Sequence, residues 1–256
     1  MNVKYFFLIY FLLLSCSIFS QNNQSLFKFE EKIKISEKEK KTIPKEVLKN
    51  IEAKMLWSPA TLYYKQGRSV YVIEDKEIKD LENSDRIKKQ SIVYSKKMFF
   101  KDYKKNNLKS QVNYKFETVI INEPLLSFKW KLINETKLIN GIKCYKAITK
   151  TEREGDVIAW YTDFFGIQDG PQKFFGLPGL IVYLEHDFMA YRLKKATKNK
   201  NFSMPVYDKK AYIVNREQYD KEFVNADKNV TLKNETIKNK TNINIRGKSF
   251  NIGKKN

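Results

Sequence analysis

Gly176-Leu177-Pro178-Gly179-Leu180-Ile181 specifies a sharp corner of the backbone inside a run of aromatic and apolar residues. Because proline holds φ at about −65°, Pro178 suits the second position of a type II turn, and Gly179 is predicted to supply the positive φ of the third position. A second corner, Asp169-Gly170-Pro171, lies shortly before the first. The short segment 172–175 is therefore held between two corners.

The chain on both sides of these corners alternates apolar and polar residues with the period of two that is typical of β-strands. Two hairpins are predicted, one at Asn140-Gly141, which tolerates the two positive φ values of a type I′ turn, and one at His186-Asp187. Two helices are predicted, from Pro44 to about Met55, where the helix would cover one side of a sheet, and from Asn215 to about Val224. The strands are predicted at 62–64, 70–73, 91–94, 97–103, 111–121, 128–139, 142–151, 157–162, 180–185 and 190–195, the first two joined around Gln66-Gly67.

These elements predict a mainly β (β-rich α+β) protein, in which antiparallel strands form a curved open sheet or partial barrel with one or two covering helices. The 256 residues, of which 42% are hydrophobic, suit a single domain with extensions. The predicted organisation is a signal peptide at 1–20, a loosely ordered polar leader at 21–43 with at most a frayed strand, a single domain at 44–228, and a weakly ordered basic tail at 229–256.

The N-terminus has the features of a secretory signal, with Lys4 followed by a long apolar run and small residues before Gln21. This predicts export through the Sec route to the periplasm or outer membrane, or to the exterior of the cell. The alternative is lipidation of Cys16, because Leu13-Leu14-Ser15-Cys16 resembles a lipoprotein cleavage box, although the bulky Leu14 argues against it. No later apolar run reaches the ~18 residues of a membrane-spanning helix.

The formal net charge of +20 raises the question of an acidic partner. Specific binding of nucleic acid is not predicted, because only 6 of the 49 basic residues are Arg, the side chain that contacts bases and phosphates with two hydrogen bonds. Lys occurs together with abundant Asn and Ile, as a compositional bias of the source would produce. A weak association with anionic membrane surfaces stays open as an alternative.

Few residues indicate catalysis or metal binding. With His186 as the only His and Cys144 as the only Cys after the signal, the sequence lacks the ligands of a familiar zinc site, so no metal and no cofactor is predicted. His186 is predicted to be an exposed turn residue and Cys144 a small buried one. No motif of nucleophilic catalysis or of phosphate or dinucleotide binding occurs. The enzymatic alternative is a hydrolase that uses two of the carboxylates Asp163, Asp169 and Glu185.

Aromatic residues crowd the approach to the corners in greater number than one strand face can bury. They are predicted either to fill one end of the core or to form a binding surface for an envelope protein or an apolar ligand. The candidate surface consists of Trp160, Tyr161, Phe164, Phe165, Phe174 and Phe175.

The region of the corners closely resembles the signature of the GLPGLI family, a group of exported proteins of the Bacteroidota. The residues that carry the resemblance are Trp160-Tyr161-Thr162, Ile167, Asp169-Gly170-Pro171, Phe174 and Gly176 to Ile181, with Phe128-Lys129-Trp130-Lys131-Leu132, Gly141 and Cys144-Tyr145-Lys146-Ala147 upstream. The resemblance covers roughly residues 60–225. The chain departs from the family pattern at Gln172, where an aromatic residue is frequent, and also at Phe175 and Asp163.

The resemblance implies export and a shared β architecture. The family has no established activity, so no catalytic residue is carried over, and its members tend to be encoded near TonB-dependent outer-membrane transporters. We therefore predict a non-enzymatic binding or accessory protein of the cell envelope that serves a TonB-dependent transporter system. The alternatives are a carboxylate-dependent hydrolase and a basic scaffold on anionic lipid.

Overall fold

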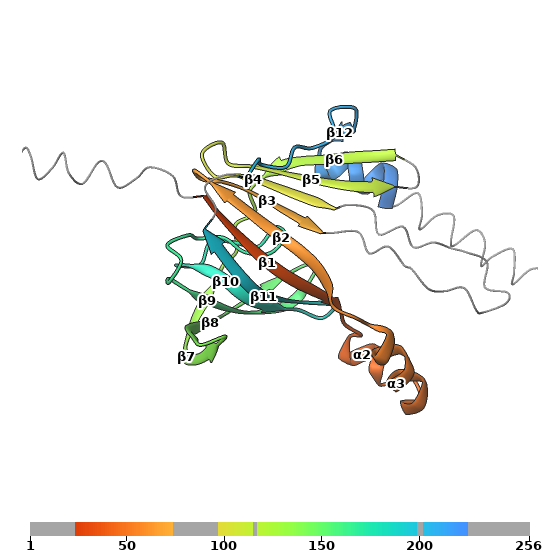
Figure 1. The fold of residues 1–256 in the computed structure, drawn as a ribbon. Coiled ribbons are helices and arrows are strands. Elements are labelled where there is room, and N and C mark those ends of the chain that lie inside the picture. The colour runs from red at the N-terminus through yellow and green to blue at the C-terminus, as the bar shows by residue number, and fades with distance from the viewer. Residues whose placement is uncertain (1–23, 74–96, 115–116, 199–201, 225–256) are drawn as a thin grey trace, which may run out of the picture.

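The structure, a computed structural model, describes residues 24–73, 97–114, 117–198 and 202–224 (Figure 1). The predicted signal peptide, Cys16, the predicted strand at 91–94 and the predicted basic tail lie outside the described residues. Among the helices of the described ranges, none combines the length and the apolar composition that crossing a bilayer requires.

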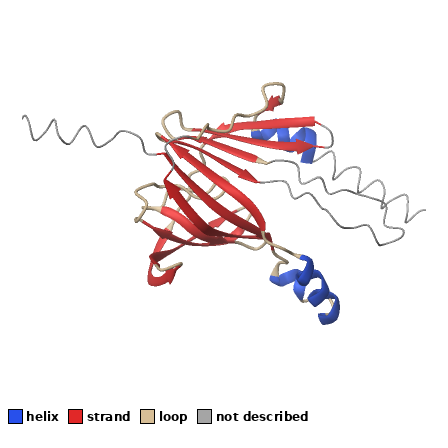
Figure 2. Ribbon diagram, in the orientation of Figure 1, coloured by secondary structure: helices blue, strands red, loops and turns tan. Residues whose placement is uncertain are grey.

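One open sheet makes up most of the described part of the chain (Figure 2). Its strands are β1 (Gln24–Ile33), β2 (Ser58–Lys65), β3 (Arg68–Ile73), β4 (Met98–Asp102), β5 (Asn107–Tyr114), β6 (Glu117–Pro124), β7 (Lys131–Ile139), β8 (Ile142–Thr151), β9 (Gly155–Thr162), β10 (Leu180–Glu185), β11 (Met189–Lys198) and β12 (Tyr212–Val214). In the described ranges their order is β12-β6-β5-β4-β3-β2-β1-β11-β10-β9-β8-β7. Neighbouring strands are antiparallel except β12 and β6, which are parallel. The predicted mainly β class with an antiparallel sheet is confirmed.

The sheet curls, so that its two halves face each other across a concave side (Figure 1). Register shifts in β1, β7 and β10 are irregularities of the kind that bend strands and increase their twist. Two ion pairs span the concave side: Lys101 of β4 contacts Asp169 of the loop between β9 and β10, and Arg153 at the β8–β9 turn contacts Asp220 near the C-terminal end of the described chain. The prediction of a curved open sheet is therefore confirmed.

Strand β1 lies in the middle of the sheet, between β2 and β11. The prediction of a loosely ordered leader is wrong for Gln24–Ile33. Phe27, Phe29 and Glu31 are buried, whereas the alternate residues Lys28 and Glu30 are more exposed. Since successive side chains of a strand point to opposite faces, the segment is an amphipathic strand: Lys28, Glu30 and Lys32 occupy its outer face, and Glu31 is the charged residue on its buried face.

The type I′ turn predicted at Asn140-Gly141 is confirmed. These two residues have φ values of 52° and 76° between β7 and β8. The turn predicted around Gln66-Gly67 joins β2 and β3, and its φ values of 49° and 74° follow the same pattern. Positive φ at both central residues matches the right-handed twist of the flanking strands, and it sets the register of each hairpin.

The helices are α2 (Glu37–Lys40), α3 (Lys45–Lys54), α4 (Arg216–Tyr219) and the π-helical turn η2 (Asp220–Val224). Helix α3 confirms the helix predicted after Pro44, but none of its residues is buried. Figure 1 shows that α2 and α3 lie beyond the ends of β1 and β2. The prediction that this helix covers the sheet is therefore wrong. Helix α4 begins at the predicted cap Asn215, and Tyr219 and Phe223 pack against β6 and β12. One of the two predicted helices thus covers the sheet.

Two large clusters of buried hydrophobic residues make up most of the core. The first contains Phe27, Phe29 and Trp160, and the second contains Tyr161 and Phe174. Cys144 belongs to the first cluster and is a free, fully buried cysteine whose thiol pKa is raised by burial. The prediction of a small buried residue is confirmed there.

Candidate functional site

The loop between β9 and β10 carries both predicted corners and is anchored by a buried ion pair. The Lys101 ammonium contacts the Asp169 carboxylate, and both side chains are completely buried. The ammonium also donates to the backbone carbonyl groups of Gly170 and Phe174, at 2.9 and 3.4 Å. Burial lowers the pKa of Lys101, and the neighbouring Asp169 opposes this effect. The loop is thereby attached to β4, a strand of the opposite half of the sheet.

Gly179 is needed for close packing and not for a positive φ. Its φ lies outside the left-handed region, so the predicted type II turn is wrong. The N–H of Gly179 instead donates to the carbonyl of Leu177 at 2.7 Å, which closes a three-residue turn centred on Pro178. A Cβ atom at Gly179 would lie 2.1 Å from the carbonyl oxygen of Thr162. The glycine therefore lets the corner rest directly on the backbone at the end of β9.

The corner at Gly176 to Ile181 packs directly against the corner at Asp169-Gly170-Pro171. The backbone N–H of Ile181 donates to the carbonyl of Asp169 at 2.8 Å. A Cβ atom at Gly170 would lie 2.8 Å from the side chain of Ile181 and 2.9 Å from the carbonyl oxygen of Phe174. The two corners thus form one compact unit, in which both central glycines are required by contact.

The six aromatic residues of the predicted binding surface do not form one surface. Trp160, Tyr161 and Phe174 are buried in the two core clusters. Phe165 and Phe175 are half-buried, with ring edges against Phe27 and Tyr103 at centroid distances of 5.3 and 5.4 Å. Phe164 is 72% exposed. Most of the set therefore fills the core, which was the other interpretation of these residues.

The three predicted carboxylates have separate environments. Asp163 is exposed, and Asp169 is enclosed with Lys101. Glu185 accepts from Lys34 at 2.9 Å and from the Tyr183 hydroxyl at 3.0 Å. A fully buried, ion-paired Asp169 cannot reach a substrate, so the structure lends no support to a catalytic pair that includes it.

A cavity of about 1070 Å³ opens on the concave side of the sheet. Its polar lining includes Glu31 of β1, Glu154 near the start of β9, Gln172 and Lys173 of the corner loop, and His186. Its apolar lining includes Ile33, Met55, Leu56, Ile73, Phe99, Val112, Ile121, Phe174, Met189, Tyr191 and Tyr219. Local sequence patterns do not predict this site, because the lining comes from segments that are distant in the chain. The sequence feature that could have indicated the site is Glu31, an acidic residue on the same strand face as Phe27 and Phe29.

Glu31 is the most unusual ionisable group of the cavity. It is 7% exposed, and burial raises the pKa of its carboxyl group to about 7. The amide of Gln172 donates to its carboxylate at 3.2 Å, and this hydrogen bond together with the more distant Lys97 opposes the effect of burial. Gln172 makes the contact from a left-handed backbone conformation with φ of 48°. A glutamate at this position therefore titrates near neutral pH.

His186 is buried, so the prediction of an exposed turn residue is wrong. Its ring lies 6.0 Å from the rings of both Phe174 and Tyr191, measured between centroids. Burial lowers the pKa of His186 below its usual range, against the opposing charge of Glu154. The side chain lines the cavity, next to Phe174 of the corner loop.

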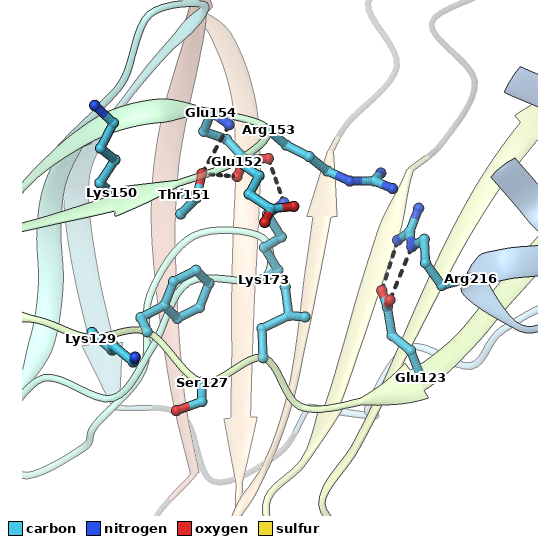
Figure 3. A pocket seen from close by; sticks show the side chains of 12 residues that line it. Glu123, Ser127, Lys129, Lys150, Thr151, Glu152, Arg153, Glu154, Lys173 and Arg216 are labelled. Atoms are coloured by element: carbon cyan, nitrogen blue, oxygen red, sulfur yellow. Dashed lines mark hydrogen bonds and ion pairs between the residues drawn. The ribbon is translucent and has the colours of Figure 1, made fainter.

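A shallower pocket of about 470 Å³ adjoins the cavity and shares Arg153, Glu154, Lys173 and Arg216 with it (Figure 3). Figure 3 shows Lys173 directed at Glu154, with 2.5 Å between their charged atoms, and Arg216 directed at both carboxylate oxygens of Glu123, at 2.7 and 3.0 Å. Arg153 pairs with Asp220 at 2.6 Å. The basic groups between the two pockets are therefore already paired with acidic ones.

Within the described ranges, no three His, Cys, Asp or Glu side chains lie together in a way that could hold a metal ion. The prediction that the protein uses no cofactor stays a prediction.

Residues 149–183 match the family described as "Protein of unknown function (Porph_ging)". This Porph_ging segment contains β9 and both corners, and it covers a minor part of the chain. Comparison with the curated proteins finds no match.

Solved structures of PNGF-II resemble the fold. In the P21 crystal form the TM-score is 0.53 at 13% identity, and the match covers 79% of this chain and 33% of that chain. In the C2 form the TM-score is 0.50 at 14% identity, with 77% and 32% covered. The chain thus spans about a third of the length of PNGF-II, and at this identity the likeness is one of fold alone.

Glu31 is expected to make the stability of the protein fall as the pH rises from mildly acidic values to neutrality. Because its pKa is about 7 in the folded state and 4.5 ordinarily, the folded state binds the proton more tightly, and the free energy of unfolding declines between about pH 4.5 and 7. Over pH 5 to 8 the loss due to this residue is about 2–3 kcal/mol. In Glu31→Gln, the free energy of unfolding measured with urea should lack this pH-dependent decline. A Glu31→Gln profile parallel to that of the wild type would contradict the assignment.

Proposed function

We propose that the chain is an exported binding protein of the cell envelope that holds a small amphipathic ligand in the concave cavity. The observation that carries this proposal is the cavity of about 1070 Å³ with its mixed lining. Ligand sites in proteins typically measure about 300–1,000 Å³ and combine apolar walls with a few convergent polar groups. The proposal moves the binding site from the aromatic surface expected from the sequence to the interior of the curved sheet.

The distribution of the lining residues supports an amphipathic ligand. Polar groups gather where the corner loop meets β1 and the β10–β11 turn, at Glu31, Gln172 and His186. Apolar side chains come from β1, β4 and β5, at Ile33, Phe99 and Val112, among others. A ligand with a polar group at one end and an apolar part at the other would satisfy both regions.

In this proposal the two corners serve the cavity by fixing its wall. The Lys101–Asp169 ion pair holds the loop against β4, and the loop contributes Gln172, Lys173 and Phe174 to the lining. A rigid loop reduces the ordering cost of binding, because the contacting side chains are already in position.

Membership of the GLPGLI family and export are part of the same proposal. The Porph_ging match lies on the segment that carries the GLPGLI resemblance, and the N-terminal signal pattern supports export through the Sec route. Service to a TonB-dependent transporter system is the envelope role that we propose by association with the family. The hydrolase alternative gains no support, since Asp169 is enclosed in its ion pair.

The binding proposal can be tested with Nile red, a neutral apolar fluorophore, and two matched variants. Ile33 is 42% exposed and lines the cavity, while Leu138 is 73% exposed on the edge strand β7, outside the lining. Ile33→Ser is expected to weaken Nile red binding about fivefold, because it removes part of one aliphatic contact. Leu138→Ser should change binding by less than about twofold. Equal effects of the two substitutions, or no saturable binding, would contradict the proposed site.

A further inference from the structure

We infer that the ligand of the concave cavity carries a protonated amine beside its apolar part, and that Glu31 is the residue that binds this amine. The inference deepens the proposed binding function and rests on it. It follows from the position of Glu31, from the state of the other charges that line the cavity, and from the surroundings of the carboxyl group.

Glu31 is held firmly at the polar end of the cavity. It lies near the end of β1, opposite Ser58 of β2 and Tyr191 of β11. Its side chain lines the cavity although it is 7% exposed. Because β1 is hydrogen-bonded to a strand on each side, the backbone at Glu31 is fixed. Its carboxyl group therefore has little freedom to move toward bulk water. It is therefore presented to whatever occupies the cavity.

Among the described residues, Glu31 has no basic partner, unlike Glu154, the other acidic residue of the lining. Glu154 is paired with Lys173 at 2.5 Å. In the described part of the chain, no Lys or Arg nitrogen lies within ion-pair distance of the Glu31 carboxylate, whose polar neighbours at close range are neutral: the amide of Gln172 and the hydroxyl of Tyr71. A buried carboxylate without a counter-ion is unfavourable. A ligand ammonium would supply the missing charge.

The basic residues of the lining do not favour an anionic ligand in the same way. Arg153 and Arg216 are paired with Asp220 and Glu123, and Lys173 with Glu154. Lys54 and Lys97, which also line the cavity, are exposed, so water already solvates their charges. The group that gains most from an opposite charge is therefore Glu31.

The surroundings of Glu31 strengthen an ion pair formed there. The groups that face it are Tyr71 of β3, Lys97 before β4, Gln172 of the corner loop and Tyr191 of β11. Tyr71 and Tyr191 are fully buried and exclude water from its vicinity. Since Coulombic attraction grows as the local dielectric constant falls, an ammonium at this point binds more tightly than at the surface. Aromatic rings near the site are also compatible with a cation.

Three probes with the same alkyl chain and different head groups test the inference: octylammonium, octanol and octanoate. Calorimetric titration of the wild type at pH 7 is expected to give about 10- to 100-fold tighter binding of octylammonium than of octanol, as a charge-assisted hydrogen bond provides. Octanoate should bind most weakly. In Glu31→Gln, the affinity for octylammonium should fall to that for octanol, and the affinity for octanol should stay within about twofold of the wild-type value.

Glu152→Gln is the matched control, because Glu152 is exposed and lines only the shallower pocket. It should leave the preference for octylammonium unchanged. A second measurement needs no variant: titrations in buffers of different ionisation enthalpy should show that octylammonium, but not octanol, releases roughly half a proton at pH 7, since an ion pair drives Glu31 to ionise.

The outcomes separate the inference from the function on which it rests. If octanol binds as tightly as octylammonium, or octanoate binds most tightly, the amine assignment is wrong and the binding function stands. If octylammonium is preferred equally by Glu31→Gln, Glu31 is not its partner. If none of the three probes binds, the proposed function itself fails and the inference falls with it.

Discussion

Replacing Asp169 by Ala is expected to lower the free energy of unfolding by about 3–5 kcal/mol, because it leaves a buried Lys101 ammonium without its counter-ion. Asp163→Ala, a substitution of an exposed carboxylate in the same loop, should change stability by less than about 0.5 kcal/mol. Urea unfolding followed by tryptophan fluorescence measures both. A loss below about 1 kcal/mol in Asp169→Ala would mean that the ion pair does not anchor the loop.

The double variant Lys101→Met with Asp169→Asn separates the charge from the packing. It removes both charges, while the oxygen of the new amide side chain can still accept from the N–H of Gly170, as Asp169 does at 2.6 Å. Because neutral replacements of buried ion pairs are often tolerated, the double variant should be more stable than Asp169→Ala. Should it be equally unstable, the anchor would depend on the hydrogen bonds to the Gly170 and Phe174 carbonyls rather than on the charge pair.

Gly179→Ala is expected to destabilise the protein by more than about 4 kcal/mol or to prevent folding, since its Cβ would lie 2.1 Å from a backbone oxygen that cannot move aside. Gly166→Ala provides the contrast. Gly166 has a φ of 65°, and a methyl group added there would meet nothing within 4 Å, so the change should cost only about 1–2 kcal/mol of backbone strain. Thermal unfolding and soluble yield measure the difference between the two variants.

Equal costs for Gly179→Ala and Gly166→Ala would contradict the packing explanation and would favour a role for Gly179 in backbone conformation. The distinction matters for the cavity, because the corner at Gly179 rests on Thr162 and the same loop carries Gln172 to Glu31. A loop displaced from the end of β9 would withdraw Gln172 and Phe174 from the lining. Loss of stability and loss of ligand binding are therefore expected to occur together in Gly179→Ala.

Local sequence signals determined much of the secondary structure. Asn140-Gly141 predicted a type I′ hairpin because both residues tolerate positive φ, and Asn215 predicted a helix start because its side chain accepts from the N–H of Gln218, at 2.8 Å. The period-two alternation predicted an antiparallel β protein. Each of these signals involves residues that are close in the chain, so the sequence alone was sufficient to detect them.

The tertiary structure decided which residues are buried and which of them meet. Lys101 and Asp169 are 68 residues apart, and Glu31 and Gln172 are 141 apart. His186 and most of the aromatic set were assigned incorrectly or left undecided, because burial depends on which segments pack over a turn. Gly179 has the residue pattern of a type II turn but serves a contact with Thr162. The candidate site exists only when the sheet curls, since its polar groups come from strands and loops that no local pattern connects.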